Sequence, residues 1–240
     1  MSERVLKDCR IYHGGYDLSG RESEIVLAYG AEIKDRTAGA TTARQKLAGL
    51  TAAEVSGGGY WDPQVNDAAL FEGLALDAQV LTVVPASGAP GSLAYTMRAA
   101  DGEYSPSGAV GDLIGYDFAA YGIGALVRGV VMESATLDAS GAGTPRELPA
   151  VPEGKALHAA LHVLGVEGTG APGVTVTIES SAANTWDGSE TVRVEFDAAL
   201  APGAQWAALP GPVTDTWWRV SWTVTGTEPG IRVVVVLGIK

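Results

Sequence analysis

Six short runs rich in β-branched and aromatic residues follow one another between residues 157 and 239, and turn-forming residues separate them. Such runs are typical of strands, because these side chains pack well on a pleated sheet while Gly, Pro, Asn and Asp suit tight turns. The runs are 157–166, 174–180, 191–197, 205–209, 217–225 and 231–239. Their spacing predicts a small antiparallel β-sandwich at the C-terminal end of the chain.

The first half also predicts strands, with a single clear helix. Residues 4–29 alternate polar and apolar around turn-forming glycines, and 66–79 place apolar residues at helical spacing. Between them, 32–50 form a long exposed excursion in which Thr41-Thr42 could cap a short helix. Glycines 57–59 permit a bulge or a close approach of backbones. The predicted fold class is mainly β: a β-sandwich or barrel core with a short helix, followed by the small C-terminal sandwich.

A stretch rich in Gly and Pro with little apolar periodicity, residues 138–154, has the composition of a connector. It predicts a core domain over 1–140, a linker over 141–154 and a C-terminal domain over 155–240.

Charge and cysteine content exclude several classes of function. The chain carries 28 acidic and 16 basic residues, a formal charge of −12, so its long-range field repels nucleic acid and anionic membranes. The one cysteine, Cys9, excludes an intrachain disulfide and is expected to be a small buried hydrophobe in a reducing compartment. The charged N-terminus lacks the apolar stretch of a signal peptide or membrane span, which predicts synthesis in a cytoplasm without membrane association.

Chemical motifs are weak throughout the sequence. His158 and His162 are four residues apart, but the run around them alternates as a strand that points both histidines outward, and a zinc site needs further ligands. Residues 168–173 spell a dinucleotide fingerprint but precede a strand and not a helix, so they predict a turn. With no Walker loop, GxSxG or cysteine-based site, the sequence predicts neither an enzyme nor a bound cofactor or metal.

Four segments of the first half together form a family pattern: YDLSG at 16–20, AEIKD at 31–35, KLAGL at 46–50 and GYWD at 59–62. The second half adds LHV at 161–163, GT at 168–169, PVTDTWWR at 212–219, and VTGT at 224–227 followed by Pro229. This pattern resembles bacteriophage tail tube (major tail) proteins, in a subgroup with an extra C-terminal β domain.

The resemblance implies a self-assembling structural protein of the virion tail. Its copies would form hexameric rings that stack into a hollow tube, with the extra domain outside. Partners would be the protein itself, the tape measure protein and other tail proteins, and DNA would pass through without being bound. The alternative is a tail-associated carbohydrate-binding module that recognises a host surface.

Two charge clusters suit that assembly. Residues 51–125 hold nine acids against one base, a net −8, and acids lining a channel would repel passing phosphates. The lumen candidates are Asp62, Asp67, Asp101, Glu103 and Asp112; a solvated acidic surface is the alternative.

The second cluster is the basic segment 34–46, which could dock on an acidic face of the next ring or be merely an exposed loop. The inter-ring candidates are Lys34, Arg36, Arg44 and Lys46.

Aromatic residues are candidates for the two hydrophobic cores. In the last part of the chain, strand alternation places Trp218 and Trp222 on one face and Trp217 on the other. Together with Trp61 they are expected to be core aromatics, while a sugar-stacking platform is the functional alternative. Trp186 lies in a predicted turn and is the candidate for an exposed aromatic.

Overall fold

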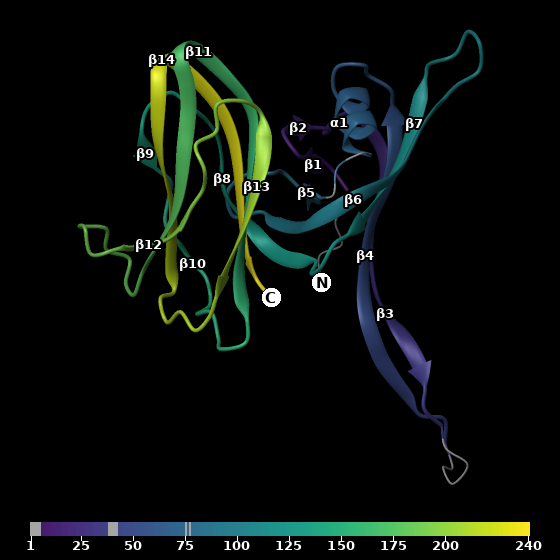
Figure 1. Ribbon diagram of the computed structural model, residues 1–240, viewed down its shortest axis with the longest axis horizontal. Helices are drawn as coiled ribbons and strands as arrows, with labels where there is room; N and C mark the ends of the chain where they lie inside the picture. The colour runs from purple at the N-terminus through teal and green to yellow at the C-terminus, as the bar shows by residue number, and fades with distance from the viewer. Residues whose placement is uncertain (1–5, 38–42, 75, 77) are drawn as a thin grey trace.

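The structure is a computed structural model that describes residues 6–37, 43–74, 76 and 78–240. Within these ranges the protein is almost entirely antiparallel β-structure with one α-helix, and it forms two lobes (Figure 1). The prediction of a mainly β fold is confirmed. No helix among the described residues is long and apolar enough to cross a membrane.

The first lobe contains a strongly curved sheet and the helix. Its elements are β1 (Arg10–His13), β2 (Tyr16–Asp17), β3 (Glu22–Asp35), β4 (Lys46–Tyr60), α1 (Asn66–Gly73), β5 (Gln79–Val84), β6 (Leu93–Ser107) and β7 (Gly115–Gly122). The strands are ordered β3-β4-β7-β6-β5-β1-β2, so β3 and β2 are edge strands. The inner face of this sheet and α1 enclose a core that includes Val55, Leu70, Leu81, Met97 and Phe118.

Two expectations for this lobe need correction. The helix predicted over 66–79 ends at Gly73, and β5 begins at Gln79. The short helix suggested after Thr41-Thr42 is wrong where it can be examined, because β4 begins at Lys46; both threonines lie outside the described residues. Cross-strand pairing with β3 outweighs the weak local helix signal there.

The second lobe contains two very long strands that fold over on themselves. Its elements are β8 (Val127–Leu137), β9 (Gly141–Ala142), β10 (Arg146–Glu147), β11 (Ala156–Ser181), β12 (Thr191–Glu195), β13 (Gly203–Pro210) and β14 (Trp217–Ile239). Each of β11 and β14 joins two of the predicted runs, and the pairing between them is bulged from Val163 to Gly173. The two halves of this hairpin face each other across a core that includes Leu161, Val176, Trp218 and Val235.

A third apolar cluster joins the lobes. The outer sides of β5 and β6 contribute Val80 and Ala94, and the strands of the second lobe contribute Val131, Ala160 and Val234. Strand β8 also pairs with both β6 and β14, so one sheet continues from the first lobe into the second (Figure 1). The apolar run Val233–Leu237 is explained by this layer, since its strand is buried on both faces.

Residues 141–154 are part of the second lobe's sheet. Strands β9 and β10 pair with β14, and Leu148 and Val151 form backbone hydrogen bonds with Thr216 and Val213. The segment therefore differs from a free connector, because its backbone groups are satisfied by a neighbouring strand. The division into domains 1–140 and 155–240 stays a prediction.

Candidate functional site

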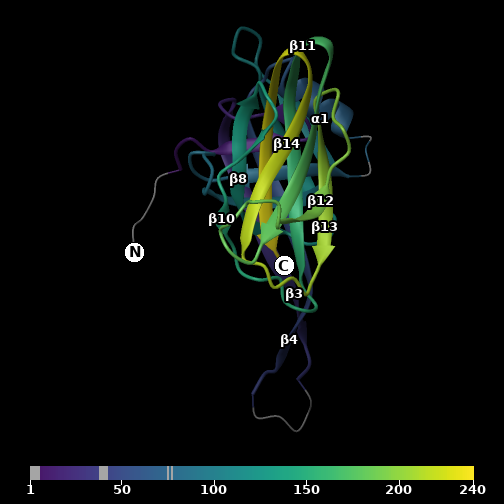
Figure 2. The same ribbon diagram turned by 90° about the vertical axis from the view of Figure 1, so that its left-hand side faces the viewer.

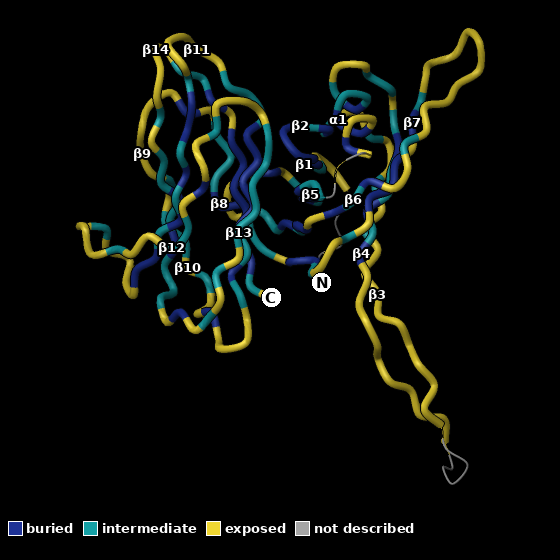
Figure 3. The backbone as a smooth tube through the Cα atoms, in the orientation of Figure 1, coloured by how far each residue is buried: buried dark blue, intermediate teal, exposed yellow. Residues whose placement is uncertain are grey.

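The most exposed element is the hairpin of β3 and β4, which projects from the first lobe (Figures 1 and 3). The two strands pair from Glu22 and Gly59 out to Asp35 and Lys46, whereas β7 reaches only the Glu54–Tyr60 part of β4. Residues 29–35 and 46–53, here called the distal hairpin, therefore form a two-stranded ribbon to which no other described strand pairs. An isolated ribbon of this kind is at best marginally stable in water.

Apolar side chains lie along this ribbon in solvent. Tyr29, Ile33, Leu47 and Leu50 are between 47% and 84% exposed. A contact with the second lobe comes from Lys240, whose Nζ donates a hydrogen bond of 2.7 Å to the Tyr29 hydroxyl. Among the described strands only β4 pairs with β3, so the outer edge of β3 offers backbone donors and acceptors to a further strand. Exposed apolar groups on an unpaired edge are typical of a surface that another chain covers.

The four inter-ring candidates come together at the end of this hairpin. Lys34, Arg36, Arg44 and Lys46, here called the basic tip, are all exposed on the two opposing strand ends. Lys34 Nζ lies 2.9 Å from Glu32 Oε1, which offsets one of the four charges. The backbone N–H of Arg36 donates to the Gln45 carbonyl at 3.0 Å and holds the strands together at this point.

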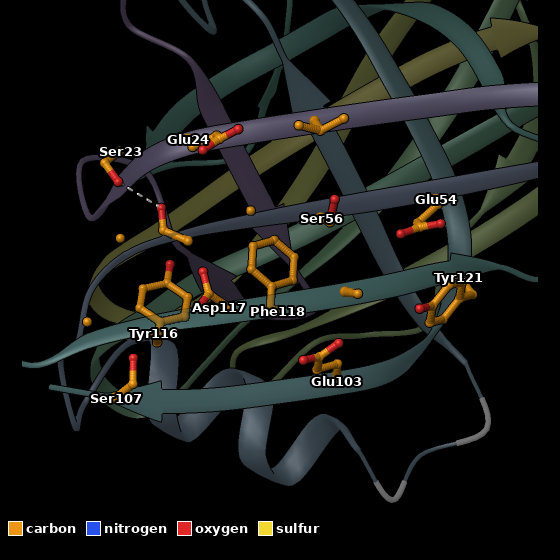
Figure 4. A pocket seen from close by; sticks show the side chains of 16 residues that line it. Ser23, Glu24, Glu54, Ser56, Glu103, Ser107, Tyr116, Asp117, Phe118 and Tyr121 are labelled. Carbon is orange, nitrogen blue, oxygen red and sulfur yellow. Dashed lines mark hydrogen bonds between the residues drawn. The ribbon is translucent and has the colours of Figure 1, made fainter.

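The outer face of the first lobe's sheet carries a second charged feature. Glu24, Glu54, Glu103 and Asp117, here called the acidic face, project from the four neighbouring strands β3, β4, β6 and β7 (Figure 4). They surround a hollow of about 490 Å³ whose described lining contains serines, glycines and tyrosines but no lysine or arginine. Carboxylates grouped on a concave wall whose described lining holds no base give a negative potential there.

Glycines on this face allow its strands to pair closely. Adding a Cβ at Gly59 would overlap the Arg21 carbonyl, and one at Gly58 would overlap the Asp117 carboxylate and the Tyr116 carbonyl. The glycine run thus permits close backbone approach on both sides of β4, one of the two roles expected for it.

The structure separates the five acids proposed for the lumen. Glu103 belongs to the acidic face and Asp112 to the exposed loop between β6 and β7, whereas Asp101 is buried with its Oδ1 2.9 Å from His13 Nε2. Asp62 pairs with Arg21 at 2.8 Å. Asp67 accepts a hydrogen bond of 2.6 Å from Tyr104, whose pKa is raised first by burial and then by this contact.

The list of lumen candidates therefore lacks three members of the acidic face: Glu54 and Asp117, which belong to the nine acids of residues 51–125, and Glu24, which lies outside that segment. The available signal was alternation, since Val55 and Phe118 are buried in the core while their chain neighbours Glu54 and Asp117 point the other way.

The tryptophans mainly serve the two cores. Trp218 is fully buried, and Trp222 packs against the same cluster with its indole N–H donating to the Ala139 carbonyl at 2.9 Å. Trp217 is partly exposed on the opposite side, beside Arg146. Trp61 packs against the first core and donates to Tyr104 at 2.9 Å.

Trp186 is partly buried, and the Arg219 guanidinium lies 4.3 Å from the centre of its ring. That cation covers one face of the ring, so the face is closed to a stacking sugar.

Alternation predicts that the His162 side chain points into solvent, and this prediction is wrong. Its strand does place Leu161 and Val163 in the core, but the other side of the strand is covered by the first lobe and His162 is fully buried. Its Nδ1 lies 2.8 Å from the Gly14 carbonyl and its Nε2 lies 2.8 Å from Thr82 Oγ1. Burial, the largest cause, lowers the pKa of His162 to about 4, so the ring is neutral and holds the lobes together as a hydrogen-bonding group.

Neither a protein-family model nor a curated protein matches the sequence. Among solved structures, a protein in the virion of a native gene transfer agent particle has 19% identity and a TM-score of 0.42, over 52% of this chain and 97% of its own. A protein of the PVC extracellular contractile injection system, in the extended sheath-tube complex, has 10% identity and a TM-score of 0.42, over 53% and 91%. The SPP1 Dit protein has 13% identity and a TM-score of 0.38, over 98% and 100%.

At TM-scores of 0.38 to 0.42 the likeness is too distant to carry an argument about function.

Proposed function

We propose that this protein is a structural tail subunit whose copies join into hexameric rings that stack into a tube. The observation that supports this most is the distal hairpin, because a two-stranded ribbon with exposed Leu47 and Leu50 and an unpaired edge needs a partner surface to be stable. A second copy supplies such a surface: it can continue the sheet at the β3 edge and cover the apolar side chains.

The acidic face is proposed to line the bore of the tube. Four carboxylates without a compensating base repel the phosphates of DNA in transit, so the polymer passes without sticking. The basic tip is proposed to dock on an acidic surface of the next ring. There its charges determine the register and orientation of one ring on the next more than the affinity between the rings.

The rest of the proposal follows from this role. The protein is located in the tail of a virion or virion-like particle after synthesis in the host cytoplasm, and it contacts the tape measure and other tail proteins. Assembly of this kind uses no catalytic group and no cofactor. A carbohydrate-binding role for the second lobe has less support, because Trp218 and Trp222 serve the core and Arg219 covers one face of the Trp186 ring.

The test is negative-stain electron microscopy of the purified protein at increasing concentration, comparing wild type with a double variant, Leu47→Glu and Leu50→Glu. Wild type should form hollow tubes or stacked rings of constant width. The double variant should remain a folded monomer, because a charge on each exposed contact position cannot be buried in the neighbour.

A matched control carries Val192→Glu and Leu200→Glu, which alter apolar residues of the second lobe that are also more than half exposed. The control should assemble as wild type does. Tubes formed equally well by the Leu47 and Leu50 double variant would contradict the proposed role of the hairpin.

A further inference from the structure

A groove at the start of β8 has a mostly apolar lining. It has a volume of about 550 Å³, and its apolar wall includes the partly exposed side chains of Leu93, Leu148 and Ile239. Two exposed cations, Arg128 and Lys155, lie at this lining, and no acidic residue does among the described residues that form it. The groove therefore suits an apolar segment that carries a negative charge.

One exposed segment of the same chain has this chemistry. The connection between β6 and β7, residues 108–114 and here called the β6–β7 tip, has the sequence GAVGDLI. Val110 is fully exposed, Leu113 is 78% exposed and Ile114 is 47% exposed, and Asp112 is exposed among them. A turn from the Asp112 N–H to the Ala109 carbonyl, at 3.0 Å, narrows this end of the hairpin.

Other exposed apolar segments fit less well. The end of β3 and β4 carries the basic tip, whose charges have the same sign as Arg128 and Lys155. Helix α1 exposes Phe71 beside Glu72, but it is packed along the first lobe and does not project. The β6–β7 tip projects freely and combines apolar side chains with one acid and no base.

The position of the tip decides which copy it can reach. In both views the tip lies at the upper end of the molecule, whereas the C-terminus, adjacent to Ile239 of the groove, lies in the lower part (Figures 1 and 2). A tip therefore reaches a groove on a different copy. The surfaces on the two copies differ, so the contact is head-to-tail and repeats from copy to copy.

We infer that the β6–β7 tip of one copy docks in the groove of the next, with Val110 and Leu113 on the apolar wall and Asp112 facing Arg128 and Lys155. This inference rests on the proposed function for its setting, because one small contact is too weak to hold two molecules alone and needs repetition in an assembly. It gives the second lobe a part in linking copies along the tube.

Binding is first measured without assembly. A disulfide-cyclised peptide spanning residues 107–115 is titrated into the full-length protein and followed by fluorescence anisotropy. It should bind saturably, and a peptide carrying Asp112→Arg should bind about five- to tenfold more weakly, since an attraction between rim charges becomes a repulsion. The Asp112→Arg peptide should recover affinity for protein carrying Arg128→Asp. Arg98→Asp, an exposed base elsewhere, is the matched control and should leave wild-type peptide binding unchanged.

The same changes are then made in the full chain and examined by electron microscopy. Asp112→Arg should reduce tube length, the combination with Arg128→Asp should restore it, and the control Asp138→Arg should have no effect. Tubes that form normally with Asp112→Arg, or peptide binding that ignores Arg128→Asp, would overturn the inference while the tube proposal stands. Charge-dependent peptide binding by a wild-type protein that forms no tubes would support the contact and count against the tube.

Discussion

Acidification should weaken the junction between the two lobes through one residue, His162. In the folded protein its ring is fully buried between Thr82 and the Gly14 carbonyl, and its pKa is lowered from 6.5 to about 4. At 1.36 kcal/mol for each pKa unit, the difference of 2.5 corresponds to about 3 kcal/mol. The unfolded chain takes up the proton first, so this part of the stability is complete above pH 6.5 and is lost as the pH falls from 6.5 towards 4.

The assay is urea denaturation of the monomeric protein, followed by tryptophan fluorescence, at several pH values across this window. Wild type should lose about 3 kcal/mol more than the variant His162→Asn on acidification, because asparagine cannot be protonated there. At neutral pH the variant should already be less stable, since the acceptor for the Thr82 hydroxyl is lost.

His158→Asn is the matched control. His158 is only partly buried, and burial lowers its pKa without a hydrogen bond to the first lobe, so most of the wild-type pH dependence should remain in this variant. Equal pH dependence of wild type and His162→Asn would refute the reasoning. The pKa of Glu22 is raised by burial, which acts in the opposite direction, and it cancels when the two proteins are compared.

Three further predictions concern the hairpin and the acidic face. Replacing three bases of the basic tip, Arg36, Arg44 and Lys46, with Glu should impair polymerisation and leave the monomer folded; unchanged tube mass in sedimentation would count against it. Gly59→Ala should destabilise the monomer by about 1–3 kcal/mol in thermal unfolding, because the added Cβ overlaps a backbone carbonyl. The control Gly30→Ala places its Cβ in open space and should lower the free energy of unfolding by much less. Neutralising all four carboxylates of the acidic face to their amides should make assembled tubes retain DNA in co-sedimentation at low salt, and retention equal to wild type would show that the face does not line the bore.

The amino-acid sequence by itself determined the fold class and much of its local detail. Alternation, turn residues and β-branched runs predicted strands in both halves, and the buried run Val233–Leu237 was recognised as one. The basic tip was likewise predictable as an exposed excursion, because few apolar residues of any size lie between residues 32 and 46. These features depend on neighbours in the chain, so local pattern is sufficient to find them.

Only the tertiary structure decided what covers each face of each strand. Alternation placed His158 and His162 on one side of β11, but a second layer of sheet, brought from the first lobe, made that side buried at His162. Asp101 and Glu103 would share a face by strict alternation, but a register shift between them in the pairing of β6 with β7 separates Asp101, buried beside His13, from Glu103 on the acidic face. Where the pairing is regular, a period of two residues tells which side chains share a face of a strand. Which face meets solvent, and where the pairing is bulged, depends on residues far apart in the chain, and that is settled only when the whole sheet folds.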